Sequence, residues 1–138
     1  MARYLLLVQL LCLTVSVHAS GVLILGDSIS AAYGIEKSAG WVALMDQQLQ
    51  ERCPDYPVIN ASVSGETTAG GKTRLPALLS RHQPELVVIE LGGNDGLRGL
   101  SPMAMASNLE QMVMLSREAG ATAAVSYTHL TLPTSLIV

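Results

Sequence analysis

Three residues with the chemistry of an acyl-transfer site each follow a predicted strand in this chain. The strands are expected over residues 22–25, 58–61 and 86–91. A serine hydroxyl can attack an acyl carbon, and a glycine backbone amide or a neutral asparagine side chain can stabilise the oxyanion that forms. We therefore predict Ser28 as the nucleophile, and the Ser28 backbone amide, Gly65 and Asn94 as the oxyanion hole.

Each of these residues also has an ordinary structural role. A serine such as Ser28 often caps the helix that follows it. A glycine such as Gly65 suits a turn, and an asparagine such as Asn94 often forms an Asx turn. The catalytic interpretation is favoured only because all three residues are expected at the same edge of one sheet.

That expectation depends on strands and helices alternating along the chain. Helices are predicted over residues 41–52, 73–82 and 101–119, and a fourth strand over 121–125. We expect Pro76 in the first turn of the second helix. Helical segments between strands are typical of βαβ units, so the sheet should be parallel with helices on both faces. Ligands bind at the carboxyl ends of such strands, where the three candidate residues lie.

Residues 1–19 have the pattern of a secretory signal peptide. Arg3 precedes an apolar stretch that is too short for a stable membrane anchor, and small residues precede a cleavage site after Ala19. We expect export to the periplasm or the medium. Residues 20–125 then form one domain, in which Cys53 is a single thiol and no intramolecular disulfide is possible.

The composition argues against a nucleic-acid-binding protein. The net charge is −3, and the Lys and Arg residues form no cluster. We therefore expect no nucleic-acid partner.

Three segments of the chain resemble the conserved blocks of the GDSL-type, or SGNH, hydrolase family. They are ILGDSISAAYGI, NASVSGETTAGG and VIELGGNDGLRGL. The resemblance is greatest to the secreted bacterial branch of thioesterases, arylesterases and lysophospholipases. It implies a flavodoxin-like three-layer α/β/α fold, a monomer, and hydrolysis of a small acyl ester or thioester with no metal and no organic cofactor. It places Ser28, Gly65 and Asn94 in the nucleophile and oxyanion positions.

The same blocks imply supporting residues around the site. Gly92 takes the place of the glycine in the third block, and Asp27 and Asp95 are part of the family motifs. We interpret both carboxylates as groups that orient the loops through hydrogen bonds to backbone amides. Arg98 follows closely and could meet an anionic leaving group.

The chain departs from the family in its last residues. The family carries its general base in an Asp-x-x-His block, and this sequence contains no such spacing. His82 is expected at the opposite edge of the sheet, and His129 has Ser126 rather than an acid three residues before it. We therefore expect residues 126–138 to be a non-native tail, the fold to be incomplete at its C-terminus, and the chain to be an inactive fragment. The alternative is a non-catalytic module that binds an acyl or carbohydrate ligand.

Overall fold

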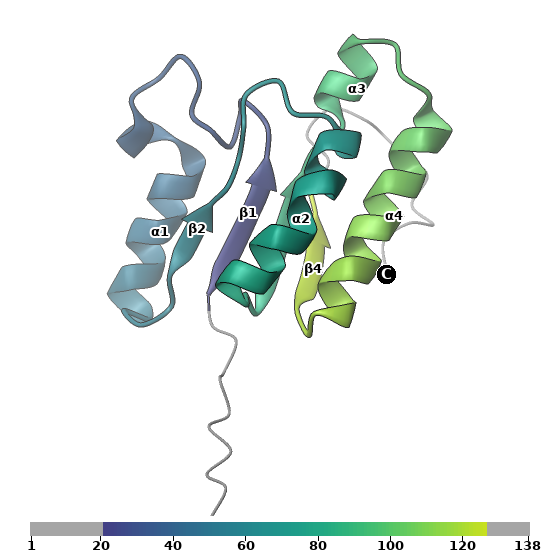
Figure 1. Cartoon of the computed structure of the whole chain (residues 1–138). Coiled ribbons are helices and arrows are strands. Elements are labelled where there is room, and N and C mark those ends of the chain that lie inside the picture. Colours follow the sequence, from purple (N-terminus) through teal and green to yellow (C-terminus); the bar gives the residue numbers. More distant parts are fainter. Residues whose placement is uncertain (1–20, 127–138) are drawn as a thin grey trace, which may run out of the picture.

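The computed structural model describes residues 21–126, in which strands and helices alternate (Figure 1). The strands are β1 (Val22–Gly26), β2 (Val58–Asn60), β3 (Leu86–Glu90) and β4 (Thr122–Val125). The helices are the 3-10 helix η1 (Lys37–Ala39), α1 (Trp41–Arg52), α2 (Thr68–His82), α3 (Gly93–Leu97) and α4 (Pro102–Glu118). The predicted strands and long helices are all present, which confirms the α/β class.

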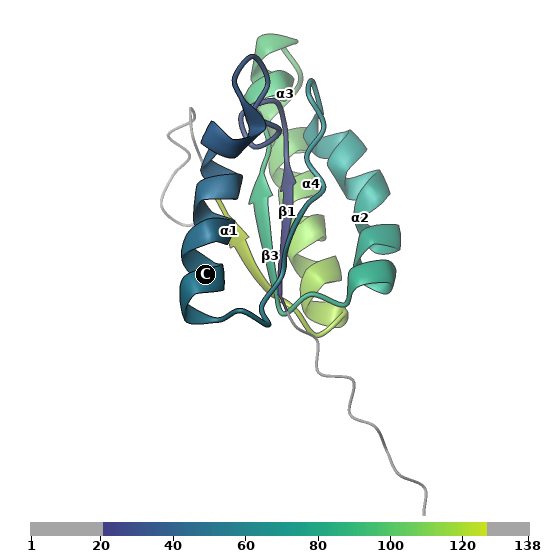
Figure 2. The ribbon, with the colours of Figure 1, turned by 90° about the vertical axis from the view of Figure 1, so that its left-hand side faces the viewer.

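The four strands form one parallel sheet in the order β2-β1-β3-β4. Helix α1 lies on one face of the sheet, and α2 and α4 lie on the other, which gives three layers (Figure 2). The loops 27–40, 61–67 and 91–101 leave the carboxyl ends of β1, β2 and β3. We call this end of the sheet the carboxyl edge. The loops 53–57, 83–85 and 119–121 form the opposite, amino edge.

Strand β1 is buried at every residue because layers of helices cover both of its faces. Leu23 belongs to the larger apolar cluster, which Leu75 of α2 and Met112 of α4 complete. Ile24 belongs to the smaller cluster on the other face, with Val42 of α1. Because successive side chains of β1 point to opposite faces of the sheet, this one strand packs against both layers of helices.

Strand β4 is less covered than its neighbours in the described part of the chain. Thr122 and Ala124 are exposed, and their register partners on β3, Leu86 and Val88, are half-buried. These four side chains share the face on which α1 lies, because Leu86 and Val88 also pack against the smaller apolar cluster. Within residues 21–126, α1 therefore covers only part of this face.

Helix α2 begins at Thr68 rather than at residue 73, so the predicted start was wrong. The Thr67 hydroxyl accepts a hydrogen bond from the Gly70 amide (3.3 Å) and caps the helix. The prediction assigned Gly71 to a loop, but a Cβ at this position would collide with Leu91, so the glycine serves close packing of α2 against the sheet. Pro76 consequently lies in the interior of α2 and not in its first turn.

The segment after β3, expected as a loop, contains the short helix α3. Gly92 precedes this helix with φ +118°, a conformation that other residues rarely adopt. A Cβ at Gly92 would also lie only 3.1 Å from the Met105 sulfur. The turn at Gly92 leads directly into α3, which carries Asn94 and Asp95.

Two predictions fall outside the described residues. They are the signal peptide over residues 1–19 and the non-native character of the tail beyond Ser126, which includes His129. Of residues 21–126, no helix combines the length and the apolar character needed to span a bilayer.

Candidate active site

Ser28 lies in a tight turn immediately after β1. The Asp27 carboxylate accepts a hydrogen bond from the Ile29 amide (3.0 Å), and the Asp27 carbonyl accepts one from the Ala31 amide (2.9 Å). The Ser28 carbonyl accepts one from the Tyr33 amide (3.0 Å). These hydrogen bonds fix the backbone around Ser28. The Ser28 side chain is half-buried and lies at the carboxyl edge.

The backbone amides of Ser28 and Gly65 have no acceptor among residues 21–126, as is also true of other amides in these loops, such as those of Ser30 and Ser64. Gly65 has φ +79°, and its carbonyl accepts a hydrogen bond from the Arg98 guanidinium (2.8 Å). Donors aimed at a developing oxyanion must be free of other partners in the resting site. This pair fits the predicted oxyanion hole.

Asn94, the third predicted donor, is already engaged. Its side-chain nitrogen donates to the Asp27 carboxylate (3.0 Å) and to the Glu66 carbonyl (3.0 Å). An amide nitrogen carries two hydrogens, so both are used. Asn94 would therefore have to share or release one of these bonds to hold an oxyanion, and its role stays a prediction. In this structure it ties the loops after β1, β2 and β3 together.

Asp95 anchors the start of α2. Its buried carboxylate, 2% exposed, accepts hydrogen bonds from the Thr68 amide (2.9 Å) and from the Thr68 hydroxyl (2.6 Å). The Asn108 side chain of α4 donates to the same hydroxyl (3.1 Å). Asp27 and Asp95 thus both bind backbone amides, the kind of contact that the sequence predicted. Arg98 binds the Gly65 carbonyl, and its predicted contact with a leaving group stays untested.

The sequence analysis missed Glu90, the last residue of β3. Its carboxylate is buried, accepts a hydrogen bond from the Ser30 hydroxyl (2.8 Å) and lies 3.5 Å from the Asp27 amide. The Trp41 indole donates to the same Ser30 hydroxyl (3.2 Å), and the Asn60 side chain donates to the Ser30 carbonyl (2.7 Å). Groups from β3, α1 and β2 therefore hold the turn that carries Ser28. An acid that ends an otherwise apolar strand is the signal that could have found it.

The Ser28 hydroxyl forms no hydrogen bond to a histidine or an acid within residues 21–126. His82 is the last residue of α2 and lies at the amino edge, as expected. Strand β3 separates it from Asn94, which lies at the carboxyl edge. The described residues also contain no group of three or more side chains suited to bind a metal ion. Within residues 21–126, the predicted nucleophile and oxyanion donors lie at one edge of the sheet, and no base is hydrogen-bonded to Ser28.

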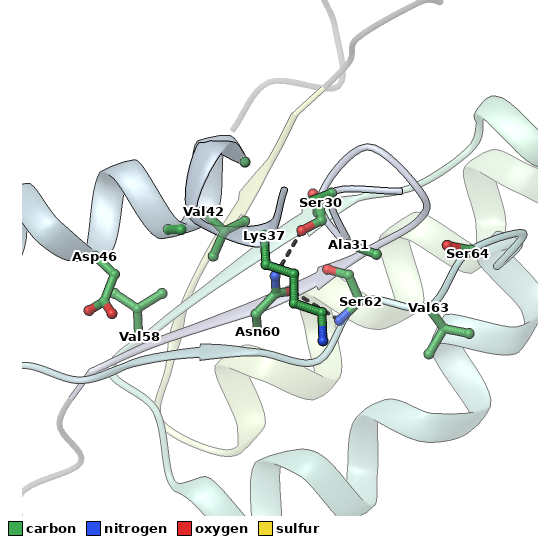
Figure 3. A pocket seen from close by; sticks show the side chains of 13 residues that line it. Ser30, Ala31, Lys37, Val42, Asp46, Val58, Asn60, Ser62, Val63 and Ser64 are labelled. Atoms are coloured by element: carbon green, nitrogen blue, oxygen red, sulfur yellow. Dashed lines mark hydrogen bonds between the residues drawn. The ribbon is translucent and has the colours of Figure 1, made fainter. Parts of the chain in front are cut away.

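A cavity of about 560 Å³ flanks the turn on the side of α1 and β2 (Figure 3). Ser30 and Ala31 of the turn form one wall, and the side chains of Lys37, Asp46 and Asn60 line the rest with Ser62 and neighbouring residues. The buried Ser62 hydroxyl has no hydrogen-bond partner in the described part of the chain. Ser28 does not line this cavity, which is adjacent to the candidate site and not part of it.

Comparisons with known proteins agree with this geometry. A model of the GDSL-like lipase/acylhydrolase family matches residues 24–136. Esterase TesA of Pseudomonas aeruginosa is 54% identical over 112 residues, which cover 81% of this chain and 56% of that protein. Thioesterase 1/protease 1/lysophospholipase L1 of Escherichia coli is 48% identical over 103 residues, which cover 75% and 48%.

The fold is also similar to a solved structure. The crystal structure of TesA matches with a TM-score of 0.75 and 53% identity, over 77% of this chain and 59% of that chain. The chain spans about half the length of the relatives that it matches. The family match includes Ser28, Gly65 and Asn94 and covers most of the residues, so the chain belongs to the GDSL-like lipase/acylhydrolase family.

Proposed function

We propose that this chain supplies the nucleophile and the oxyanion hole of a serine hydrolase that cleaves acyl esters or thioesters. The observation that carries the proposal is the pair of unpaired amides, of Ser28 and Gly65, at the edge where the Ser28 hydroxyl lies. Family membership supports it, as do the names of the relatives, an esterase and a thioesterase/lysophospholipase.

In this reaction the Ser28 Oγ bonds to the acyl carbon while its proton passes to a general base. The carbonyl oxygen becomes an oxyanion, held by the amides of Ser28 and Gly65. The tetrahedral intermediate then expels the alcohol or thiol, which takes up the proton. Water hydrolyses the acyl-serine ester and regenerates the hydroxyl. Removing one oxyanion donor costs about 2.7–4 kcal/mol in the transition state of related reactions.

We propose that the chain as given has very low activity because it contains no Asp-x-x-His block. A serine hydroxyl is a weak nucleophile without a base. Serine hydrolases that lose a triad member keep only about 10³–10⁴-fold catalysis over water, from the oxyanion hole and binding. A small base added to the solution should therefore replace the missing group in part.

The test is labelling of the full chain by a fluorophosphonate probe, with and without imidazole as an external base. We expect slow labelling at Ser28, an increase in rate with imidazole concentration, and complete loss in Ser28→Ala. Ser64→Ala is a matched control, because Ser64 is exposed in a loop of the same edge. His82→Ala should also leave the rate unchanged, since His82 lies at the amino edge.

If Ser28 is not labelled even at high imidazole in a chain whose circular dichroism shows α/β structure, the proposal is wrong. Labelling that does not respond to imidazole, and that is lost in Ser28→Ala, would instead reveal a base elsewhere in the chain. His129→Ala then decides whether His129 is that base.

A second candidate function is binding without turnover, favoured by the cavity beside α1. Its wall combines an amine, a carboxylate and an amide from Lys37, Asp46 and Asn60, and it contains the unpartnered Ser62 hydroxyl. Such a mixture suits a neutral polyhydroxyl ligand such as a carbohydrate. Binding of a sugar that Ser62→Ala abolishes, in a chain that resists labelling at Ser28, would favour this function.

A further inference from the structure

Large exposed hydrophobic side chains gather at the carboxyl edge. Residues 21–126 contain nine of them, and seven lie in the three loops of this edge or in the first turn of α4. The most exposed of these seven are Leu97 (87%), Met103 (83%), Tyr33 (78%) and Ile35 (57%). The two that lie elsewhere, Leu44 and Met114, are single residues on helices. Such a concentration of exposed apolar groups marks an interaction surface.

These side chains belong to separate loops and not to one face of a helix or of the sheet. Tyr33 and Ile35 follow β1, Val63 follows β2, and Leu97 and Met103 follow β3. The loops stand together at the upper end of the molecule in Figure 1. Because Ser28 lies in the first loop, the exposed apolar groups and the candidate nucleophile lie at the same edge of the sheet.

The charges of the same loops are few and of both signs. The exposed ionisable residues of these loops in the described chain are Glu36, Lys37 and Arg98. With the buried or half-buried Asp27, Glu66 and Asp95, the three loops contain four acids and two bases, a net charge of −2. Exposed aliphatic groups and an exposed tyrosine, with few exposed charges among them, are features of a surface that rests on a lipid interface.

We propose that the carboxyl edge docks on a lipid surface, with Leu97, Met103 and Tyr33 inserted among the acyl chains. The choice of lipid rests on the proposed function, because long-chain acyl esters, one class of substrate for such a hydrolase, aggregate in water. A protein seated on this edge would cover Ser28, while a lipid surface presents acyl esters to it. Docking itself needs neither a general base nor turnover.

The test uses the full chain and vesicles of ether phosphatidylcholine with ether phosphatidylglycerol, which contain no ester to cleave. A fluorophore sensitive to polarity is attached to a single cysteine, at Leu97→Cys or Met103→Cys, in a chain with Cys12→Ser and Cys53→Ser. We expect a blue shift of the emission when vesicles are added. The position of the probe matters because the apolar segment 1–19 can bind vesicles by itself.

Two control positions report on that segment. One is the native Cys53, exposed at the amino edge, with only Cys12 replaced. The other is Met114→Cys, which is 58% exposed on α4. Neither probe should shift. An equal shift at all four positions, or no shift at positions 97 and 103, would overturn the proposal. A shift that appears without vesicles and grows with protein concentration would assign the surface to a second copy of the chain and also overturn it.

Charged substitutions give an independent measurement. With the probe at Ile35→Cys, the pair Leu97→Asp and Met103→Asp should weaken vesicle binding at this edge by about tenfold, because two apolar groups are withdrawn from the lipid. Met114→Asp should leave binding unchanged, with all variants compared at equal circular dichroism. Unchanged binding in the double variant would contradict the proposal. Labelling of Ser28 by the fluorophosphonate probe is measured separately, so a failure of docking and a failure of the proposed chemistry are distinguishable.

Discussion

The two edges of the sheet distribute polar and apolar side chains in opposite ways. At the carboxyl edge, polar side chains are buried, namely Asp27, Ser30, Thr68, Glu90 and Asp95, while large apolar side chains are exposed. In the loops of the amino edge no large hydrophobic side chain is exposed, and exposed charged residues lie in or next to these loops, namely Arg52, Asp55, Arg81, Glu85, Arg117 and Glu118. The amino edge follows the usual rule for a protein surface, and the carboxyl edge reverses it.

The reversal is maintained by hydrogen bonds between loops. A buried polar group is tolerated only when it is hydrogen-bonded, and Asp27, Glu90 and Asp95 each form a bond that crosses from one loop or strand to another. Departures from the usual distribution are expected at functional sites. The comparison therefore locates the site at the carboxyl edge independently of any motif.

The largest expected effect is the loss of Asp95. Asp95→Ala leaves the buried amide and hydroxyl of Thr68 without their acceptor, so we expect the free energy of unfolding to fall by about 3 kcal/mol. The matched control is Asp55→Ala at the exposed amino edge, with an expected change of less than about 0.5 kcal/mol. Urea denaturation followed by circular dichroism measures both. Equal effects of the two substitutions would remove the contrast between the edges.

Strand β3 allows the same comparison within one element, since a glutamate lies at each of its ends. Glu90→Ala removes the acceptor of the buried Ser30 hydroxyl, so we expect a loss of about 2 kcal/mol. Glu85→Ala, just before the strand, removes an exposed side chain and should change stability by less than about 0.5 kcal/mol. Urea denaturation of both variants gives the difference. A destabilisation by Glu85→Ala as large as that by Glu90→Ala would contradict the burial argument.

The smallest expected effect concerns Tyr56, beside the amino edge. Burial, the charge of Glu85 and a hydrogen bond with its carboxylate raise the pKa of Tyr56 above the ordinary value of 10.0. The unfolded chain then loses this proton first, so the contribution of Tyr56 to stability is present below pH 10 and is lost as the pH rises through the folded pKa. Glu85→Gln should lower the pKa of Tyr56 toward 10.0, while Glu51→Gln should not. Titration of tyrosinate absorbance measures the change.

The parts of the fold that depend on local pattern could be predicted. An unbroken apolar run such as Val22–Leu25 indicates a buried strand, and Ser101 followed by a proline indicates the start of α4. The start of α2 could not be predicted, because Gly71 has the composition of a loop residue and its need for close contact with Leu91 is not local. Glu90 was missed because the reason for its burial, the Ser30 hydroxyl, lies 60 positions away.

The sequence by itself determined the order of the elements, the parallel sheet and the three loops that carry Ser28, Gly65 and Asn94. These features depend on periodicity, on turn residues and on the rule that parallel strands end at one edge. Only the tertiary structure decided that the amides of Ser28 and Gly65 are unpaired, and that Asn94 is held by Asp27 and Glu66. It also decided that Glu90 accepts a hydrogen bond from Ser30 of the turn and that large apolar side chains are exposed at the same edge. Hydrogen-bond partners and exposure depend on residues that are distant in the chain, so the local sequence does not specify them.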